Sequence, residues 1–445
     1  SASLPVTPPK DGNNIQLTID IDLQKIVEYE LRRGVERYGA ESGIVIAMDP
    51  QSGEILSMAS YPGFNPNTYA KNPVGTMKNR GISDTYEPGS TFKIVTAAAA
   101  LEEDITDTST VYNAHKGLLE RPGFTIRDDH PMDKVSFKEA LQHSSNIVFA
   151  KIAAEIPDHT FYKYMRDFGF GLTLNIDLPD EVKGKIPKPK DYLPFSKYFM
   201  GHGYSISVTA LQMLNAYAAV ANGGDLMQPY VVKKVVSPDG KIIDETRPLK
   251  IRRVISERTA NTLTELFKTA VKAGTGTNAD VNGIEIAGKT GTSQQLVNNK
   301  YSNQFYTASF VGYFPAERPR IAMIVILNRP SESYYGGSTA APVFRRIALK
   351  AIAVLPDFSI PNNDEKLVSG EETDSTTVPA ITGLTAKKAG KLLKSNDLVL
   401  ANFNKNSDPI MSQLPVPGEK VPRNSKIRAY YLKKKYDSTQ KRYVP

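Results

Sequence analysis

The sequence is 445 residues long, with 40% hydrophobic residues, 23% charged residues and a formal net charge of +8. A chain of this length and composition folds, and it is too long for one ordinary core, so we expect a large domain and at least one smaller unit. The absence of cysteine excludes disulfides, thiolate nucleophiles and cysteine-ligated zinc. The longest wholly apolar run, Ile321–Leu327, is far shorter than the roughly 20 residues that span a bilayer.

The predicted elements begin with a helix and two strands. Residues 20–38 carry apolar side chains at helical spacing, and Asp20 or Asp22 can cap the helix. Residues 43–48 and 54–58 are rich in β-forming residues on either side of a turn. These patterns predict an antiparallel pair of strands that follows the helix.

The middle of the chain is expected to be mainly helical, and a second group of strands follows it. Helical patterns cover residues 90–102, 136–152 and 208–220. Strand patterns cover residues 284–290, 307–314 and 321–327. The last of these strands is apolar throughout, which is typical of a strand that is buried on both faces. We therefore expect one sheet that is assembled from both ends of the chain.

A small second domain is predicted near the C-terminus. Residues 339–355 predict a helix that packs on the sheet, and residues 360–377 have the polar composition of a linker. Beyond Val378, a helical pattern at 385–393 and β-rich runs at 398–403 and 427–432 predict a small α+β module. From residue 378 to 445 there are 14 Lys and Arg against 4 Asp and Glu, a net charge of +10, so the excess positive charge belongs to this module.

The first chemical motif is Ser90-Thr91-Phe92-Lys93. Glu87-Pro88-Gly89 breaks the chain just before an alanine-rich helix, so we expect Ser90 at a helix N-terminus and Lys93 one turn later on the same face. There the lysine amine can accept the serine proton, and the helix dipole favours a developing oxyanion. The alternative is an ordinary serine cap. A second S-x-x-K match at Ser438–Lys441 lies in the polar tail, and we interpret it as coincidence.

Two further motifs follow. In Ser144-Ser145-Asn146, Ser144 can relay a proton and Asn146 can orient Lys93 and bind a substrate amide, although such a sequence is by itself usually a polar turn. Lys289-Thr290-Gly291-Thr292 stands at the end of a predicted strand. Its glycine allows close approach of a ligand, its threonines can hold a carboxylate, and Lys289 adds positive potential that favours a neutral Lys93. The alternative for this motif is a strand that ends in a flexible turn.

The order S-x-x-K, S-x-N, K-T-G is that of β-lactamases and penicillin-binding proteins. Together with residues 79–89 and with Gly201-His202-Gly203 ahead of Ser207-Val208-Thr209, these motifs make the chain resemble the class B penicillin-binding proteins, and among them the division-type septal transpeptidases. The implied fold is α+β, with a five-stranded antiparallel sheet flanked by helices and a helical subdomain. Residues 378–434, with Val378-Pro379, Gly383, Ala389 and Pro417-Gly418, more loosely resemble a PASTA module. The expected domains are a linker remnant at 1–15, the transpeptidase domain at 16–356, a linker at 357–377, the module at 378–434 and a basic tail at 435–445.

The resemblance implies a peptidoglycan D,D-transpeptidase with a serine acyl-enzyme. Ser90 would attack the penultimate D-alanine of a stem peptide that ends in D-Ala-D-Ala, while Lys93 takes the serine proton and Ser144 passes a proton to the leaving amine. The amine of a neighbouring stem peptide would then resolve the acyl-enzyme, and β-lactams would block Ser90 covalently. The full set of implied site residues is catalytic Ser90, Lys93, Ser144, Asn146 and Lys289, substrate-binding Thr290, Gly291 and Thr292, and an oxyanion hole from the backbone N–H groups of Ser90 and Thr292.

No cofactor, metal or nucleic-acid partner is expected. The sequence contains no glycine-rich phosphate loop. Its five histidines show no metal-ligand spacing, so we interpret them as surface or supporting residues; they are His115, His130, His143, His159 and His202. The resemblance implies a membrane glycan polymerase and division proteins as partners. It also implies a membrane anchor and a pedestal domain that this sequence lacks, so we expect a truncated form of a protein at the extracytoplasmic face of the bacterial membrane.

Other functions remain open from the sequence. A D,D-carboxypeptidase or a β-lactamase of the same fold would share Ser90, Lys93, Ser144 and Lys289 and would differ in how the acyl-enzyme is resolved. No glutamate is clearly placed to activate water as in class A β-lactamases. A non-catalytic β-lactam sensor or cell-wall-binding protein, whose basic module holds an anionic polymer, is a third reading.

Overall fold

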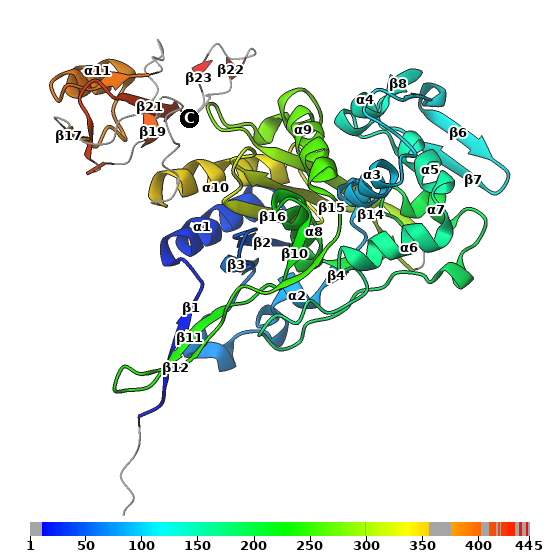
Figure 1. Ribbon diagram of the computed structural model, residues 1–445, viewed down its shortest axis with the longest axis horizontal. Coiled ribbons are helices and arrows are strands. Elements are labelled where there is room, and N and C mark those ends of the chain that lie inside the picture. Colours follow the sequence, from blue (N-terminus) through cyan, green and yellow to red (C-terminus); the bar gives the residue numbers. More distant parts are fainter. Residues whose placement is uncertain are drawn as a thin grey trace, which may run out of the picture. The chain divides into compact units, whose positions relative to one another are not determined.

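The computed structural model describes residues 11–298, 300–355, 375–401, 409–414, 417–418, 420–431, 436–437 and 442–443. The chain divides into two compact units, one of residues 1–280 and 284–344 and the other of residues 281–283 and 345–445. All three sequence motifs lie in the first unit, which is shown with the second in Figure 1.

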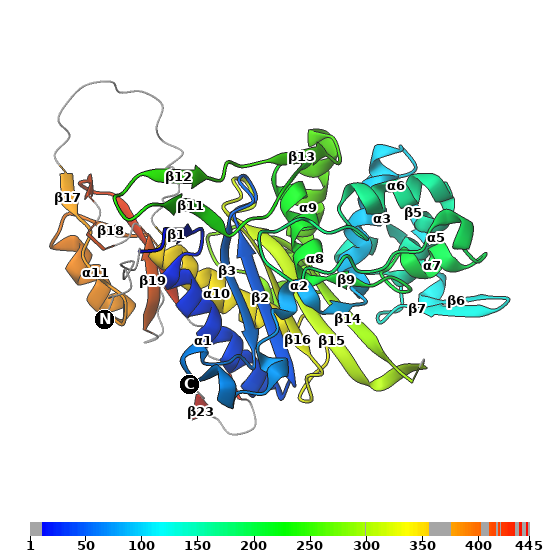
Figure 2. The same ribbon diagram turned by 90° about the horizontal axis from the view of Figure 1, so that it is seen from below.

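A five-stranded antiparallel sheet forms the centre of the first unit (Figure 2). Its strand order is β14 (Ala287–Val297), β15 (Lys300–Phe314), β16 (Ile321–Asn328), β2 (Ser42–Met48) and β3 (Ile55–Tyr61). Every residue of Ile321–Leu327 is buried, as its apolar composition predicts. The register pairs Ile324 of β16 with Ile46 of β2, which confirms that strands from both ends of the chain form one sheet.

Helices cover both faces of this sheet. On one face lie α1 (Ile21–Tyr38), whose N-terminus is capped by the Asp20 carboxylate, and residues 340–344, the part of α10 (Ala340–Val354) that belongs to this unit. The two helices touch, because a Cβ on Gly34 would lie 2.6 Å from the side chain of Val343. On the other face lie α8 (Ala210–Ala221), which is buried along its whole length, and α9 (Glu257–Ala273). The predicted layers of helix and sheet are therefore confirmed.

A helical subdomain is built from the middle of the chain and packs next to α8 and α9 (Figure 1). Its helices are α3 (Lys93–Glu102), α4 (Phe137–Gln142), α5 (Asn146–Glu155), α6 (Asp158–Asp167) and α7 (Ser196–Met200). Its strand pairs are β5 (Val111–Asn113) with β8 (Lys134–Ser136), and β6 (Leu118–Arg121) with β7 (Phe124–Arg127). Fully buried aromatic side chains fill its core, namely Phe92, Phe137, Phe149, Phe161, Phe168 and Phe170.

Shorter elements complete the first unit. They are α2 (Arg80–Ser83), β4 (Thr85–Tyr86) with β9 (Val208–Thr209), β10 (Asp225–Met227) with β13 (Lys250–Arg253), and the sheet of β1 (Asn14–Leu17), β11 (Val232–Val236) and β12 (Ile242–Glu245). Short 3₁₀ helices cover Pro66–Lys71, Val74–Thr76, Gly89–Phe92, His115–Gly117, Pro189–Asp191 and Thr277–Ala279.

Three sequence predictions are wrong at the level of elements. The helix that was predicted from Ser90 begins at Lys93, because Gly89–Phe92 forms a 3₁₀ turn. The single helix that was predicted at 136–152 is two helices with a break at residues 143–145. The strand that was predicted to end near Lys289 begins at Ala287 and continues to Val297, so the K-T-G motif lies within the strand rather than at its end.

The second unit contains a small α+β module. Its elements are β17 (Ser375–Thr377), α11 (Ala386–Lys394), β18 (Val399–Leu400), β19 (Ile410–Leu414), β20 (Lys420–Pro422), β21 (Lys426–Tyr431), β22 (Tyr436–Asp437) and β23 (Arg442–Tyr443). Apolar residues such as Ile381, Leu393 and Ile427 form its own core. Strand β17 pairs with β20, so three residues that the composition assigned to the linker belong to the module. Residues 357–374 of that linker, and most of the basic tail at 435–445, lie outside the described residues.

Candidate active site

Ser90 lies in the 3₁₀ turn Gly89–Phe92, which we call the Ser90 turn. Gly89 has a φ of +55°, and its N–H donates a hydrogen bond to the carbonyl oxygen of Gly203 at 3.1 Å. A Cβ on Gly89 would lie 3.2 Å from the Cβ of Ser293 in β14, so both the backbone conformation and the close packing favour glycine. Within the turn, the hydroxyl of Thr91 donates to the carbonyl oxygen of Pro88 at 2.9 Å.

The amine of Lys93 brings the first two motifs together. Its Nζ lies 3.1 Å from Ser90 Oγ, 3.0 Å from Ser144 Oγ, 2.6 Å from the Ser144 carbonyl oxygen and 2.9 Å from Asn146 Oδ1. The side chain is fully buried. Either form of the amine can make three hydrogen bonds to these four oxygens: an ammonium donates three, and a neutral amine donates two and accepts one from a hydroxyl. Both serine hydroxyls lie within hydrogen-bonding distance of the amine.

Burial also lowers the pKa of this amine. Loss of solvation lowers the pKa of Lys93 from 10.5 to about 7, against the opposing effect of the negative charges of Asp128 and Asp129. Near neutral pH a substantial fraction of Lys93 is therefore uncharged. A neutral amine next to a serine hydroxyl is what a serine nucleophile needs as its base.

The break between α4 and α5 places Ser144 and Asn146. Ser144 has a φ of +64°, and this turn of the backbone aims its hydroxyl and its carbonyl oxygen at Lys93. Asp128 follows β7 and caps α5: its carboxylate accepts from the Asn146 N–H at 2.5 Å, the Ile147 N–H at 3.0 Å and the Ser145 hydroxyl at 2.7 Å.

The neighbouring carbonyl oxygen of Arg127 accepts from Asn146 Nδ2 at 3.0 Å, which turns the amide oxygen of Asn146 towards Lys93. Sequence analysis missed Asp128 and Arg127, because they lie 18 to 19 residues from Asn146 and no spacing rule connects a hairpin end with a helix start.

Lys289 and Thr290 form a second polar group on β14. Lys289 is fully buried, and its Nζ lies 3.4 Å from the hydroxyls of Thr275 and Thr290, which are themselves 2.6 Å apart. Burial, together with the positive charge of Lys93, lowers the pKa of Lys289 well below its ordinary value. A bound carboxylate would favour its protonated form.

Glycine at position 291 lets β14 pack on the Ser90 turn. A Cβ there would lie 2.4 Å from Ser309 Oγ, 3.0 Å from Thr91 Cγ2 and 3.1 Å from the carbonyl oxygen of Pro88. The absence of a side chain at Gly291 thus allows close packing within the protein, and the approach of a ligand to this glycine stays a prediction. On β14 the hydroxyl of Thr292 accepts from the Gly336 N–H at 3.0 Å. The strand and the turn touch, so all eight predicted site residues belong to one contiguous region, with Ser90, Lys93, Ser144 and Asn146 in direct contact.

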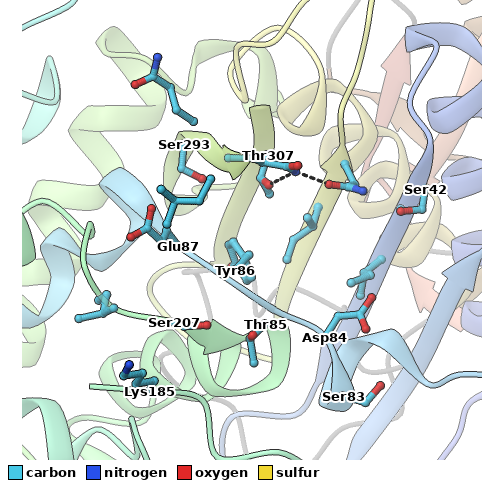
Figure 3. A pocket seen from close by; sticks show the side chains of 18 of the residues that line it. Ser42, Ser83, Asp84, Thr85, Tyr86, Glu87, Lys185, Ser207, Ser293 and Thr307 are labelled. Atoms are coloured by element: carbon cyan, nitrogen blue, oxygen red, sulfur yellow. Dashed lines mark hydrogen bonds between the residues drawn. The ribbon is translucent and has the colours of Figure 1, made fainter. Parts of the chain in front are cut away.

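A cavity of about 720 Å³ adjoins this region (Figure 3). It is lined by residues just before the Ser90 turn, by residues just after Thr292 and by residues 205–207, and Figure 3 shows Glu87 and Ser293 at one end and Ser42 at the other. The Glu87 carboxylate accepts from the Ser205 N–H at 2.7 Å and from the Tyr301 hydroxyl at 3.2 Å. Burial raises the pKa of Glu87. None of the eight predicted site residues lines this cavity, which adjoins the site through the neighbouring residues Glu87 and Ser293.

The segment Gly201–Gly203 contacts both the Ser90 turn and helix α3. Besides the contact between Gly89 and Gly203, the hydroxyl of Thr96 in α3 donates to the carbonyl oxygen of Gly201 at 2.9 Å. His202 is buried against Phe199, and burial together with the charge of Lys93 lowers the pKa of His202 to about 3, so it stays neutral.

In the part of the chain that the structure describes, no cluster of three His, Cys, Asp or Glu residues could hold a metal ion. Within the same residues, no helix is long and apolar enough to cross a membrane.

Comparison with known proteins assigns the two parts of the chain. The penicillin binding protein transpeptidase domain model matches residues 43–349, and the PASTA domain model matches residues 376–431. Stage V sporulation protein D of Bacillus subtilis is 34% identical over 95% of this chain and 66% of its own length, and peptidoglycan D,D-transpeptidase FtsI of Escherichia coli is 32% identical over 79% and 58%.

The chain thus spans between about half and two thirds of the length of such relatives. Among solved structures, penicillin-binding protein 3 of Mycobacterium tuberculosis in complex with aztreonam has a TM-score of 0.73 at 30% identity, covering 77% of this chain and 79% of that one. With the five-stranded sheet and the convergence of the three motifs, these matches show that the chain belongs to the penicillin-binding protein transpeptidase family and carries a C-terminal PASTA domain.

Proposed function

We propose that this chain is the catalytic part of a peptidoglycan D,D-transpeptidase, which joins stem peptides through an acyl-enzyme on Ser90. The observation that carries the proposal is the position of the Lys93 amine, within 3.1 Å of Ser90 Oγ, Ser144 Oγ and Asn146 Oδ1 and with a pKa of about 7. This arrangement supplies a nucleophile, its base and a second hydroxyl for proton relay.

Acylation begins with attack of Ser90 Oγ on the carbonyl carbon of the penultimate D-alanine. The serine proton passes to the neutral amine of Lys93, and the backbone N–H groups of Ser90 and Thr292 stabilise the oxyanion, each such donor being worth about 3 kcal/mol. As the carbon–nitrogen bond breaks, the proton moves from Lys93 through the Ser144 hydroxyl to the leaving nitrogen. Free D-alanine departs, and an ester remains on Ser90.

The acceptor step runs through the same groups in reverse. The amine of a second stem peptide attacks the ester carbonyl carbon and gives up its proton through Ser144 to Lys93. Lys93 returns a proton to Ser90 Oγ as the carbon–oxygen bond breaks, and the new peptide bond is the cross-link. Thr290 and Thr292 hold the terminal carboxylate of the donor, which also favours a protonated Lys289 next to it.

Biological context is part of the proposal. Similarity to FtsI of Escherichia coli supports a role in septal cell-wall synthesis at the extracytoplasmic face of the bacterial membrane, together with a membrane glycan polymerase and division proteins. Two solved structures of penicillin-binding protein 3 from Mycobacterium tuberculosis contain aztreonam and ampicillin, which supports covalent inhibition of Ser90 by β-lactams.

The test is a competition between an amine and water for the acyl-enzyme. The protein is mixed with a thioester mimic of the donor peptide and with D-alanine as acceptor, and the aminolysis and hydrolysis products are separated by chromatography. We expect an aminolysis product that increases with the acceptor concentration and is absent from Ser90→Ala. Hydrolysis alone at every acceptor concentration would contradict the proposal and would point to a carboxypeptidase or β-lactamase.

A further inference from the structure

Helix α8 makes a side-chain contact to the backbone of the Ser90 turn. The hydroxyl of Tyr217 donates a hydrogen bond to the carbonyl oxygen of Thr91 at 2.9 Å, although the two residues are 126 positions apart. Tyr217 is fully buried, and its ring packs on Phe267 of α9, with the ring centroids 5.2 Å apart. Two helices thus fix the ring, and the hydroxyl points at the carbonyl oxygen of Thr91, the residue after Ser90.

The Ser90 turn packs closely on β14 but makes few hydrogen bonds with other elements. Among the described residues, Ser90 Oγ makes one hydrogen bond, with Lys93 Nζ. In the described part of the chain, two hydrogen bonds join the backbone of the turn to other elements. The Gly89 N–H donates to the Gly203 carbonyl oxygen, and the Tyr217 hydroxyl donates to the Thr91 carbonyl oxygen. The first involves only backbone atoms. The second depends on one side-chain oxygen, which a substitution can remove.

The amine of Lys93 is held by contacts that do not involve Tyr217, although its backbone follows the turn directly and its N–H donates to the Ser90 carbonyl oxygen. Ser144 and Asn146 contact this amine, so the distance between Ser90 Oγ and Lys93 Nζ depends on where the turn places Ser90. The same placement sets the Ser90 N–H relative to β14. A displacement of about 1 Å between reacting groups can lower a rate by about 100-fold.

We propose that Tyr217 is a positioning residue for Ser90: its hydroxyl holds the Thr91 carbonyl and thereby fixes Ser90 Oγ relative to Lys93 and the Ser90 N–H relative to Thr292. This inference rests on the proposed acyl-enzyme function and extends it to a residue that none of the three motifs contains. Tyr217 touches neither substrate nor reacting atoms, so it acts only through the backbone of the turn.

Tyr217→Phe tests the proposal, with Tyr313→Phe as a matched control. Tyr313 is also fully buried, and its hydroxyl makes one hydrogen bond, with Thr264 Oγ1 at 2.7 Å in α9, away from the Ser90 turn. Both variants lose one buried hydroxyl and should melt at similar temperatures. Stopped-flow acylation with a fluorescent penicillin should show a first-order acylation rate about 10-fold lower for Tyr217→Phe and within twofold of wild type for Tyr313→Phe.

Two further readouts separate positioning from a general loss of structure. The dissociation constant of the complex that precedes acylation should be unchanged, and so should the midpoint of the pH profile, because the contacts of Lys93 remain. The rate is measured on molecules that become labelled, so partial unfolding lowers the amplitude and not the rate. Equal rates in the two variants, or an unchanged rate in Tyr217→Phe, would overturn the inference. A wild-type protein that is not acylated would instead overturn the proposed function.

Discussion

At the scale of single residues, the proposed chemistry depends on one buried amine. Desolvation lowers the pKa of Lys93 to about 7, and the two aspartates near it prevent a deeper fall. Four oxygens surround the amine, and three of them come from residues 144 and 146. The side chain is thus held firmly and is still able to release and take up a proton at neutral pH.

Acylation should follow the protonation state of this amine. Lys93 can accept the Ser90 proton only when its amine is neutral. Below the pKa of Lys93, the fraction of protein molecules with a neutral amine falls about tenfold per pH unit. Above that pKa, this fraction approaches a constant. We therefore expect the second-order rate of acylation by penicillin to rise with pH, to have a midpoint near 7 and to level off above it. A rate that is independent of pH between 5 and 9 would show that Lys93 is not the base.

Asp128 should have two separable effects on this profile. Its charge favours the protonated amine, and its carboxylate fixes Asn146 and Ser145. Asp128→Asn should therefore move the midpoint to lower pH and also lower the plateau rate, by about 10-fold, because Asn146 is less well held. Asp129→Asn removes a charge from an exposed side chain and should shift the midpoint alone. Identical plateau rates in the two variants would contradict the positioning effect of Asp128.

At the scale of elements, the sequence predicts which helices and strands exist better than where they begin and end. Periodicity gives α1, α8, α10 and the five strands, because their apolar patterns are long and regular. The break between α4 and α5 was missed, because the helical spacing of apolar residues continues on both sides of it. The structure separates the two helices through the positive φ of Ser144 and through Asp128, which caps α5. The end of β14 was missed as well, because pairing of Leu296 and Val297 with Tyr301 and Lys300 extends it through polar residues.

The packing of β14 on the Ser90 turn gives a prediction for the strand. Gly291→Ala would place a Cβ against Ser309 Oγ, Thr91 Cγ2 and the Pro88 carbonyl, and the strand would have to move away from the turn. We expect the acylation rate to fall about 100-fold and the free energy of unfolding to fall by about 1–3 kcal/mol.

Gly75→Ala is the control, because a Cβ there meets nothing within 4 Å. Denaturant unfolding and acylation kinetics of both variants provide the measurements. A Gly291→Ala protein that is acylated as fast as the control would show that the turn tolerates a displaced strand.

At the scale of the whole molecule, the three motifs are far apart in the chain. They meet because strands from both ends of the chain pair with each other in one sheet. Residues 42–61 supply two strands and residues 287–328 supply three, so the helical subdomain and α8 must lie between them in sequence. The strand patterns at both ends of the chain predicted this sheet, and the family resemblance predicted that the three motifs meet in one site. The contacts of Tyr217, Asp128 and Gly203 could not be predicted, because they depend on tertiary packing between segments with no shared motif.

The PASTA domain should be dispensable for acylation. It has its own apolar core, and every proposed site residue lies in the other unit. A chain that ends at residue 355 should therefore be acylated by penicillin within twofold of the rate of the full chain. Stopped-flow measurements on both chains test this expectation. A tenfold lower rate in the shortened and still folded chain would show that the C-terminal unit contributes to the site.

Mass spectrometry after incubation with penicillin can show whether Ser90 is the nucleophile of an acyl-transfer site built around Lys93. We expect the intact protein to gain the mass of one penicillin molecule, the modified peptide to contain Ser90, and Ser90→Ala to gain nothing. Label on another residue, or label that persists in a folded Ser90→Ala protein, would contradict it.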